Sequence, residues 1–263
     1  MIHACPERKW YVENYLIPSL LIQGITMDQI ILWVDEEKKG CLESCMKAFD
    51  SLPEDGCTWH LQDDIIICSD FKRLTEEYQN YAPIVCGYCY WRNKGCPPGF
   101  NHPMYMWYSF PCIKINNKIA KECANWFYTS AKNDIKYQEY VSTGKFDDTM
   151  FREYCREHYM TEYIVYNLKP NLVDHIDYLI GGSTVNRERK ETVTAAAYFE
   201  EPERVKELEE RLTKKNLRVA AYCGTRNLYK DMVPAVKSLL VNSNVDKIYL
   251  LIEDDQFPYK LPP

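Results

Sequence analysis

Short apolar runs alternate along the chain with longer segments in which apolar residues recur every three or four positions. The runs predict buried strands, and the spaced segments predict amphipathic helices. Strands are predicted at 1–5, 29–34, 58–61, 65–68, 83–91, 111–115 and 163–166, and helices at 11–23, 41–49, 70–78, 118–129 and 148–159. This alternation of strands and helices predicts a layered α/β domain.

A charged segment separates this domain from a second, smaller pattern. The polar stretch 181–191 is typical of a chain that leaves a domain, and 202–215 predicts a helix with Pro in its first turn. The pattern then restarts with a strand at 217–222, a helix at 228–241 and a strand at 247–252. The predicted organisation is a domain at 1–183, a linker with a charged helix at 184–216 and an incomplete second α/β unit at 217–263.

The second unit is too small to bury its own apolar faces, because even domains of roughly 60 residues are only marginally stable. Leaving apolar surface in water costs about 25 cal/mol per Å². We therefore expect 217–263 to dock on the first domain or to pair with the same unit of a second chain.

Composition and charge exclude several classes of protein. Of 263 residues, 46% are hydrophobic and 27% are charged, which is the composition of a globular chain and not of a disordered one. The formal net charge is -6, so nothing draws the whole molecule towards nucleic acid or an anionic membrane. A phosphate-bearing ligand would need a local device, such as a bound metal ion, to hold it.

No apolar run reaches the roughly 18 residues of a membrane span, and the longest candidate, 15–25, is interrupted by Pro18 and Gln23. No basic segment followed by an apolar stretch marks the N-terminus for secretion. Most of the 12 Cys lie in apolar strings, where free Cys behaves as a small hydrophobe. These features predict a soluble, cytoplasmic protein with reduced, buried thiols.

The string of Gln62, Asp63 and Asp64 is the strongest chemical signal in the chain. Two adjacent carboxylates at the end of a strand, followed by more apolar residues, place like charges where burial is costly. A divalent cation with oxygen ligands would neutralise them and would also bridge the phosphates of a nucleotide. Alternatively, the pair forms an ordinary turn or helix cap.

Together with three further features in the same order, this string gives 1–183 a likeness to a known family. The first predicted strand leads to Cys5, Pro6 and Arg8, and the second ends at Asp35. The chain resembles the nucleotide-sugar-dependent glycosyltransferases of the GT-A fold. The resemblance implies a Rossmann-like α/β/α sandwich with a central mixed sheet, in which Pro6 and Arg8 lie at the nucleotide and Asp35 contacts its base or ribose.

The same resemblance assigns roles to the acidic residues. Asp64, and with it Gln62 and Asp63, corresponds to the family's aspartate motif, which binds the metal and the diphosphate. The first position of that motif is Gln here, so metal ligation would depend mainly on Asp64. His175, in the string PNLVDHI, resembles the third metal ligand of many such domains.

The catalytic base follows from the same comparison. Phe146, Asp147 and Asp148 stand before a predicted helix and resemble the element that supplies the base in inverting members, with Asp148 preferred over Asp147. The resemblance implies metal-assisted transfer of a sugar, with inversion, from a UDP-sugar in the presence of Mn²⁺ or Mg²⁺. The acceptor would be a carbohydrate or glycoconjugate, and no nucleic acid would take part.

Other interpretations of the same residues remain open. Cys86, Cys89, Cys96 and His102 could together hold a tetrahedral zinc ion, although strand alternation would place Cys86 and Cys89 on opposite faces. The aromatic stretch 105–110 suits either the core or an acceptor sugar. The loop predicted at 93–103 is the candidate element on the acceptor side.

The second unit resembles the opening of a glycogenin-like glycosyltransferase domain. Asp254 and Asp255 imitate an aspartate motif in composition, but they follow only the second strand of that unit. We therefore assign them no catalytic role. A homo-oligomer could form through this unit.

Two other functions compete with sugar transfer. Clustered carboxylates and a His also suit a metal-dependent phosphoryl hydrolase or nuclease, although the acidic net charge argues against a nucleic-acid substrate. The Gln in the aspartate motif also suits a non-catalytic carbohydrate- or nucleotide-binding scaffold.

Overall fold

A computed structural model describes residues 1–89, 98–103, 110–181, 202–213, 219–224 and 247–252. The chain divides into two compact units, Met1–Lys206 and Glu207–Pro263. Each unit is described by itself below.

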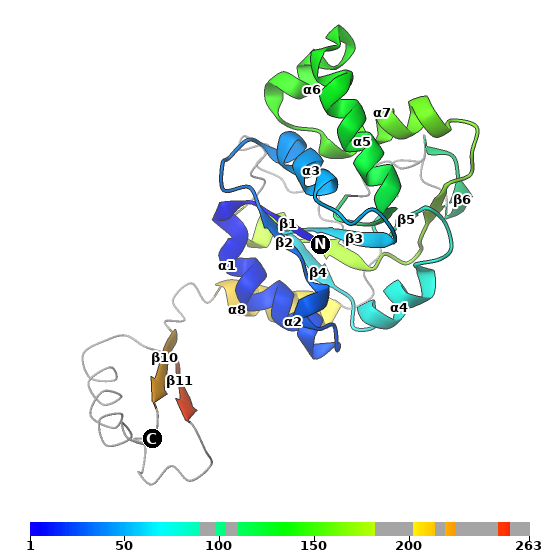
Figure 1. Cartoon of the computed structure of the whole chain (residues 1–263). Helices are drawn as coiled ribbons and strands as arrows, with labels where there is room; N and C mark the ends of the chain where they lie inside the picture. Colours follow the sequence, from blue (N-terminus) through cyan, green and yellow to red (C-terminus); the bar gives the residue numbers. More distant parts are fainter. Residues whose placement is uncertain (90–97, 104–109, 182–201, 214–218, 225–246, 253–263) are drawn as a thin grey trace. The chain divides into compact units, whose positions relative to one another are not determined.

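A mixed seven-stranded sheet forms the centre of the first unit (Figure 1). Its order is β2-β1-β3-β7-β5-β8-β6. Strand β1 is parallel to both β2 and β3, whereas β7 is antiparallel to its neighbours β3 and β5. The strands are β1 (Ile2–Ala4), β2 (Leu32–Val34), β3 (Cys57–Gln62), β5 (Ile84–Cys86), β6 (Gly99–Asn101), β7 (Cys112–Asn116) and β8 (Val165–Asn167).

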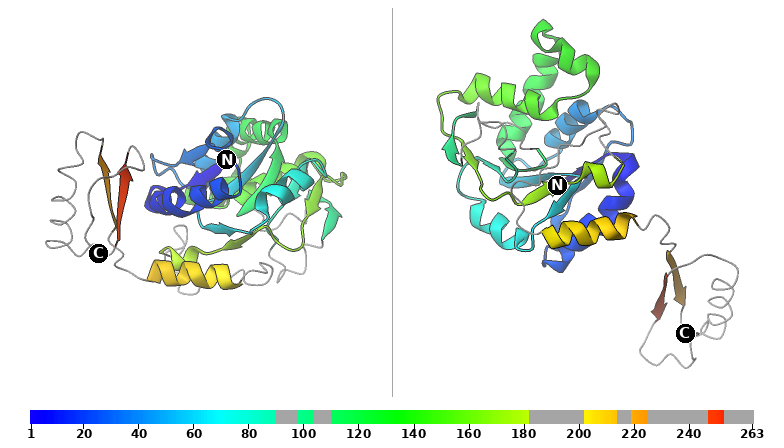
Figure 2. Two further views of the ribbon diagram at one scale, coloured as in Figure 1. Left: turned by 90° about the horizontal axis from the view of Figure 1, so that it is seen from below. Right: turned by 180° about the vertical axis from the view of Figure 1, so that it is seen from behind.

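Helices cover both faces of this sheet (Figures 1 and 2). The α-helices of the first unit are α1 (Lys9–Tyr11), α2 (Ile17–Ile22), α3 (Cys41–Asp50), α4 (Phe71–Tyr78), α5 (Asn117–Thr129), α6 (Gln138–Thr143) and α7 (Asp147–Tyr159). A π-helical turn, Val12–Leu16, joins α1 to α2. Short 3-10 turns lie at Pro6–Arg8, Met27–Gln29, Ala131–Asn133, Ile135–Tyr137 and Asp177–Leu179.

Alternation along β3 shows how the sheet separates two helical layers. Trp59 packs towards α4, with its ring centroid 6.5 Å from that of Phe71. The next residue, His60, points to the other face, where its ring lies 5.6 Å from Phe49 of α3. The main core lies on that second face, where Phe49, Phe127 and Phe151 of α3, α5 and α7 are fully buried. The predicted α/β class and the mixed sheet are therefore confirmed.

A second, two-stranded sheet joins two distant segments. Strand β4 (Ile65–Ile67) directly follows the acidic string and pairs antiparallel with β9 (Val173–His175). The apolar sequence III predicts β4, but PNLVDHI gave no strand prediction. The predicted loop 93–103 also differs from the structure, because Gly99–Asn101 forms β6 and pairs with β8 at the sheet edge.

The second unit is described only in part. The predicted charged helix is present as α8 (Pro202–Thr213), which extends across the boundary between the units. Strands β10 (Val219–Gly224) and β11 (Lys247–Ile252) form a parallel pair. The helix predicted at 228–241, together with Asp254 and Asp255, lies outside the described residues.

Candidate functional site

A pocket of about 370 Å³ opens at the carboxyl ends of β1, β2 and β3. The chain leaves β1 for β2 on one side and reaches β3 on the other, so the strand order reverses at β1. Open α/β sheets bind ligands at such a switch point, because the loops that follow the strands diverge there. The topology alone therefore makes this pocket a candidate ligand site.

The pocket brings together most of the residues singled out in the sequence. Its lining includes eight of the nine candidates, namely Pro6, Arg8, Asp35, Gln62, Asp63, Asp64, Asp147 and His175. The ninth, Asp148, is not among the described residues that line it. Four separate segments of the chain thus converge on one cavity.

Arg8 lies at the centre of the acidic string. Its Nη1 donates to Asp63 Oδ1 at 2.9 Å and also contacts Asp64 Oδ2, and both acids are more than nine-tenths buried. The backbone N–H of Cys5 donates to Asp63 Oδ2 at 2.7 Å. The positive charge that two buried carboxylates require is therefore supplied by Arg8, which the resemblance had placed only at the nucleotide.

The pairing of β4 with β9 brings His175 to Asp64. Ile65 lies opposite His175 in the antiparallel register, and the backbone N–H of Ile176 donates to Asp64 O at 2.8 Å. His175 Nε2 consequently lies 3.0 Å from Asp64 Oδ2. Two residues far apart in sequence are thus fixed side by side by backbone hydrogen bonds.

The charges of this cluster shift its titrations in opposite directions. Burial opposes the ionised form of Asp64, but His175 and Arg8 outweigh it and lower the pKa of Asp64. Burial likewise opposes the charged form of His175, and the Asp64 carboxylate outweighs it and raises the pKa of His175. Burial and the Asp64 charge raise the pKa of Asp63. Asp64 is therefore the acid that stays ionised.

The donor set around Asp64 fits a hard divalent ion. Asp64 Oδ1 is buried and has no hydrogen-bond partner among the described residues, so one carboxylate oxygen still lacks a contact. Two adjacent ligands of an octahedral ion with bonds of about 2.1 Å lie about 3 Å apart, which matches the separation of Asp64 Oδ2 and His175 Nε2. Asp64 and His175 would hold the ion, and Arg8 would lie next to it.

Asp147 reaches the pocket from the first turn of α7. Phe146, the residue before it, has a left-handed backbone with φ 68° and begins the helix. Asp147 is 6% exposed, and its Oδ2 has no hydrogen-bond partner within the described part of the chain. Burial and the neighbouring Asp148 raise the pKa of Asp147 to about 7.

Asp148 is engaged within its own helix. Its Oδ1 accepts from the backbone N–H of Thr149 at 2.6 Å and from the Thr149 hydroxyl at 3.3 Å. Because it does not line the pocket, the preference for Asp148 over Asp147 has no support in the geometry. Asp147 is the carboxylate that a ligand in the pocket would meet.

Asp35 shapes the loop that follows β2. Its two carboxylate oxygens accept from the backbone N–H groups of Lys39 at 3.1 Å and Gly40 at 3.0 Å. This arrangement holds Gly40 against Gly144, where a Cβ on Gly40 would meet Gly144 O at 2.7 Å. Asp35 still lines the pocket, but its oxygens are already used by the backbone.

Several pocket residues gave no signal in the sequence. Lys38 and Lys145 add positive charge to the lining, Gly144 closes one side, and His3 contributes from β1. The close contact of Gly40 with Gly144 could have been suspected from the two glycines alone only if their loops were known to meet.

The competing zinc set is described only in part. Cys86 and Cys89 are both buried, and the ring centroid of His102 lies 3.9 Å from that of Tyr163. Cys96 lies outside the described residues, as do 105–109 of the aromatic stretch. Phe110, the last residue of that stretch, is 2% exposed and belongs to the core.

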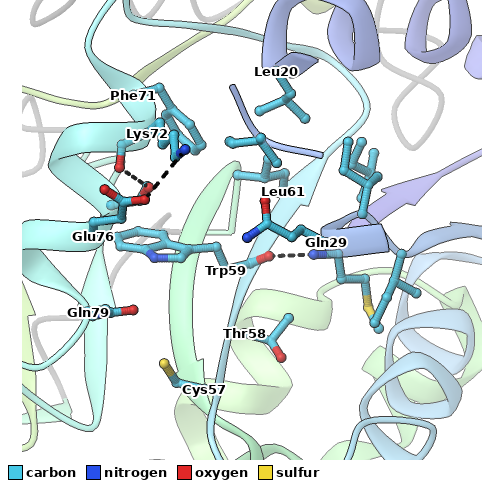
Figure 3. Close-up of a pocket in the computed structure, with 16 residues that line it drawn as sticks. Leu20, Gln29, Cys57, Thr58, Trp59, Leu61, Phe71, Lys72, Glu76 and Gln79 are labelled. Atoms are coloured by element: carbon cyan, nitrogen blue, oxygen red, sulfur yellow. Dashed lines mark hydrogen bonds and ion pairs between the residues drawn. The ribbon is translucent and has the colours of Figure 1, made fainter. Parts of the chain in front are cut away.

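A second pocket, of about 310 Å³, lies at the opposite ends of β1 and β3 (Figure 3). Its lining is largely apolar and includes Leu20, Trp59 and Phe71, with the Lys72–Glu76 ion pair of α4 at one side. None of the nine candidate residues lines it. The chemistry indicated by the sequence is therefore confined to the first pocket.

Comparisons with known proteins add no identification: no family model, no curated protein and no solved structure matches the chain. Across the described residues, no helix has both the length and the apolar character needed to cross a membrane. Function must therefore be argued from the pocket itself.

Proposed function

We propose that the pocket at the ends of β1, β2 and β3 binds a nucleotide sugar and that the protein is an inverting glycosyltransferase. The observation that carries this proposal is the convergence of Arg8, Asp64, His175 and Asp147 on one cavity at a switch point of the sheet. This set combines cationic groups, a donor set for a divalent ion and a protonatable carboxylate. The resemblance to the GT-A fold, which rests on the same residues, supports it.

The cationic side of the pocket suits a diphosphate. Arg8 is held by two carboxylates, and Lys38 and Lys145 also line the cavity. Asp64 and His175 would hold Mn²⁺ or Mg²⁺, which as a Lewis acid stabilises the charge that develops on the departing diphosphate. Arg8 would keep its position beside the phosphates and offset their charge.

Asp147 would act as the general base. The acceptor hydroxyl oxygen forms a bond to the anomeric carbon while the bond from that carbon to the diphosphate oxygen breaks. The nucleoside diphosphate leaves with the electron pair, and the hydroxyl proton passes to Asp147. A carboxylate whose pKa is about 7 is well matched to this step, because a base works best when its pKa lies near the working pH.

A binding experiment tests the pocket directly. The melting temperature of the full chain is measured with UDP, GDP, ADP and CDP, each with and without Mn²⁺. We expect one nucleoside diphosphate to raise it in a metal-dependent way, as ligands that bind only the folded state do. Asp64→Asn should remove the metal dependence, because the amide keeps the shape of the side chain but not its charge. Asp70→Asn, an exposed helix-cap position, is the control.

Two outcomes would contradict the proposal. If no nucleoside diphosphate stabilises the chain, the pocket is not a nucleotide site. If binding occurs but release of inorganic phosphate replaces sugar transfer in the presence of UDP-sugars, the protein is a phosphoryl hydrolase.

A specific observation favours a second candidate, a nucleotide-binding scaffold without catalysis. Arg8 already neutralises Asp63 and Asp64, so the folded cluster does not require a metal ion. In that case nucleoside diphosphates would stabilise the chain equally with and without Mn²⁺, and no sugar transfer would be detected.

A further inference from the structure

A cluster of metal-ligating side chains lies apart from the acidic string. His3 of β1, Cys45 of α3 and His60 of β3 each offer a ligand atom, and these atoms lie within 4.8 Å of one another. All three residues are buried, with exposed fractions of 8%, 0% and 2%. The three elements that carry them pack at the layer of the core between the sheet and α3.

His60 is the observation that points to a ligand. Neither of its ring nitrogens has a hydrogen-bond partner among the described residues, although the side chain is almost completely buried. Buried polar groups in proteins are nearly always paired, so such a ring requires an explanation. A metal ion bound to one ring nitrogen would supply the missing contact.

The other two ligands are suitably prepared. His3 Nε2 lies 2.8 Å from Ser44 Oγ, and Trp33 Nε1 donates to the same hydroxyl at 3.2 Å. Such outer contacts fix the orientation of a ligating imidazole. Burial lowers the pKa of His3 to about 4 and that of His60 well below its usual value, so both rings are in the neutral form that binds metals.

We propose that His3, Cys45 and His60 form a second metal site, selective for a zinc-class ion. Two imidazoles and a thiolate are the nitrogen and sulfur donors that zinc prefers, whereas Mg²⁺ and Mn²⁺ prefer oxygen. Zn²⁺ replaces the thiol proton of Cys45, forming a Zn–S bond and releasing one H⁺ to solvent. His3 also lines the pocket, which gives the ion a route to the cluster.

This site is independent of the proposed transferase function. It uses none of the residues assigned to nucleotide, metal or base in the pocket. A failure of sugar transfer would leave it standing, and its own failure would leave the transferase proposal intact.

Cobalt substitution tests the site, because Co²⁺ bound to a thiolate shows a charge-transfer band in the near ultraviolet. The full chain is stripped with a chelator, titrated with Co²⁺ and then with Zn²⁺ as competitor. We expect the wild-type chain to show the band at one equivalent and to lose it as Zn²⁺ displaces Co²⁺. Cys45→Ser should abolish the band, and His60→Gln should weaken Co²⁺ binding by at least about tenfold.

Two control variants separate this cluster from other sites in the chain. Cys123→Ser removes another fully buried thiol of the same core and should keep the band. Asp64→Asn removes the candidate ligand in the pocket and should keep it too. A wild-type chain without the band, or a band that survives in Cys45→Ser, would overturn the proposal. If Cys45→Ser does not fold by circular dichroism, the wild-type titration and His60→Gln still decide.

Discussion

Asp147 and Asp148 are neighbours in sequence but have different surroundings. Asp148 accepts two hydrogen bonds from Thr149, whereas Asp147 Oδ2 has no partner in the described chain and lines the pocket. Burial raises the pKa of both carboxyls, and that of Asp147 reaches about 7. A buried acid without a partner is costly to ionise, so its retention beside a cavity suits proton transfer.

Replacing Asp147 by Asn should change stability in a way that depends on pH. Between about pH 4 and pH 7 the folded chain holds a proton on Asp147 that the unfolded chain releases, because the folded pKa is raised. The unfolding free energy of the wild type should therefore fall relative to Asp147→Asn as pH rises through this range, by about 1.4 kcal/mol for each unit of pKa difference. Urea unfolding at a series of pH values measures this.

Matched variants complete that experiment. Asp55→Asn changes an exposed carboxyl and should show no such trend. Sugar transfer should be lost by a factor of about 10² or more in Asp147→Asn and retained in Asp148→Asn. A difference between wild type and Asp147→Asn that stays constant with pH would mean that Asp147 is already ionised in the folded state.

At the scale of elements, the apolar runs predicted most of the central sheet and the helices around it. Strands such as β3 and β7 and helices such as α5 have a clear period because one face of each is buried. The failures have physical causes. Strand β9 owes its conformation to pairing with β4, and β6 owes its to the sheet edge, so neither depends on a local pattern.

The candidate site was predictable as a set of residues but not as an arrangement. The order of the acidic string, Asp147 and His175 could be seen in the sequence. That Arg8 neutralises Asp63 and Asp64, and that Asp147 rather than Asp148 faces the cavity, depends on backbone paths that no local pattern encodes.

The contact between Gly40 and Gly144 gives a prediction at this scale. Gly40→Ala should be strongly destabilising, because φ is 91° and the new Cβ would meet Gly144 O at 2.7 Å. The matched control is Gly99→Ala, which has φ 94° but no heavy atom within 4 Å of the new Cβ. Both variants carry backbone strain of about 1–3 kcal/mol, so the excess loss in Gly40→Ala measures the steric clash, which we expect to add about 1–3 kcal/mol.

Chemical unfolding of both glycine variants measures this excess. The clash should also displace the start of α7 and weaken nucleotide stabilisation, because Gly40, Gly144 and Asp147 line the same pocket. Equal losses in the two variants would show that the loops separate at little cost.

At the scale of the whole molecule, the two units differ in how complete they are. Every lining residue of the pocket belongs to Met1–Lys206, and the main core lies there as well. The described strands of the second unit are a parallel pair, β10 and β11. Parallel strands are normally covered on both faces, and two strands alone do not form a stable sheet in water.

Ending the chain after Lys215 should therefore separate two properties. Metal-dependent stabilisation by a nucleoside diphosphate should persist, since the truncation removes no pocket residue. The melting temperature or the molar mass in light scattering should change, because apolar strands of this kind gain about 25 cal/mol for each Å² that they bury against another surface. Loss of nucleotide stabilisation in a folded truncated chain would place part of the site in the second unit. An unchanged mass and melting curve would instead show that residues 216–263 bury no surface against the first unit or another chain.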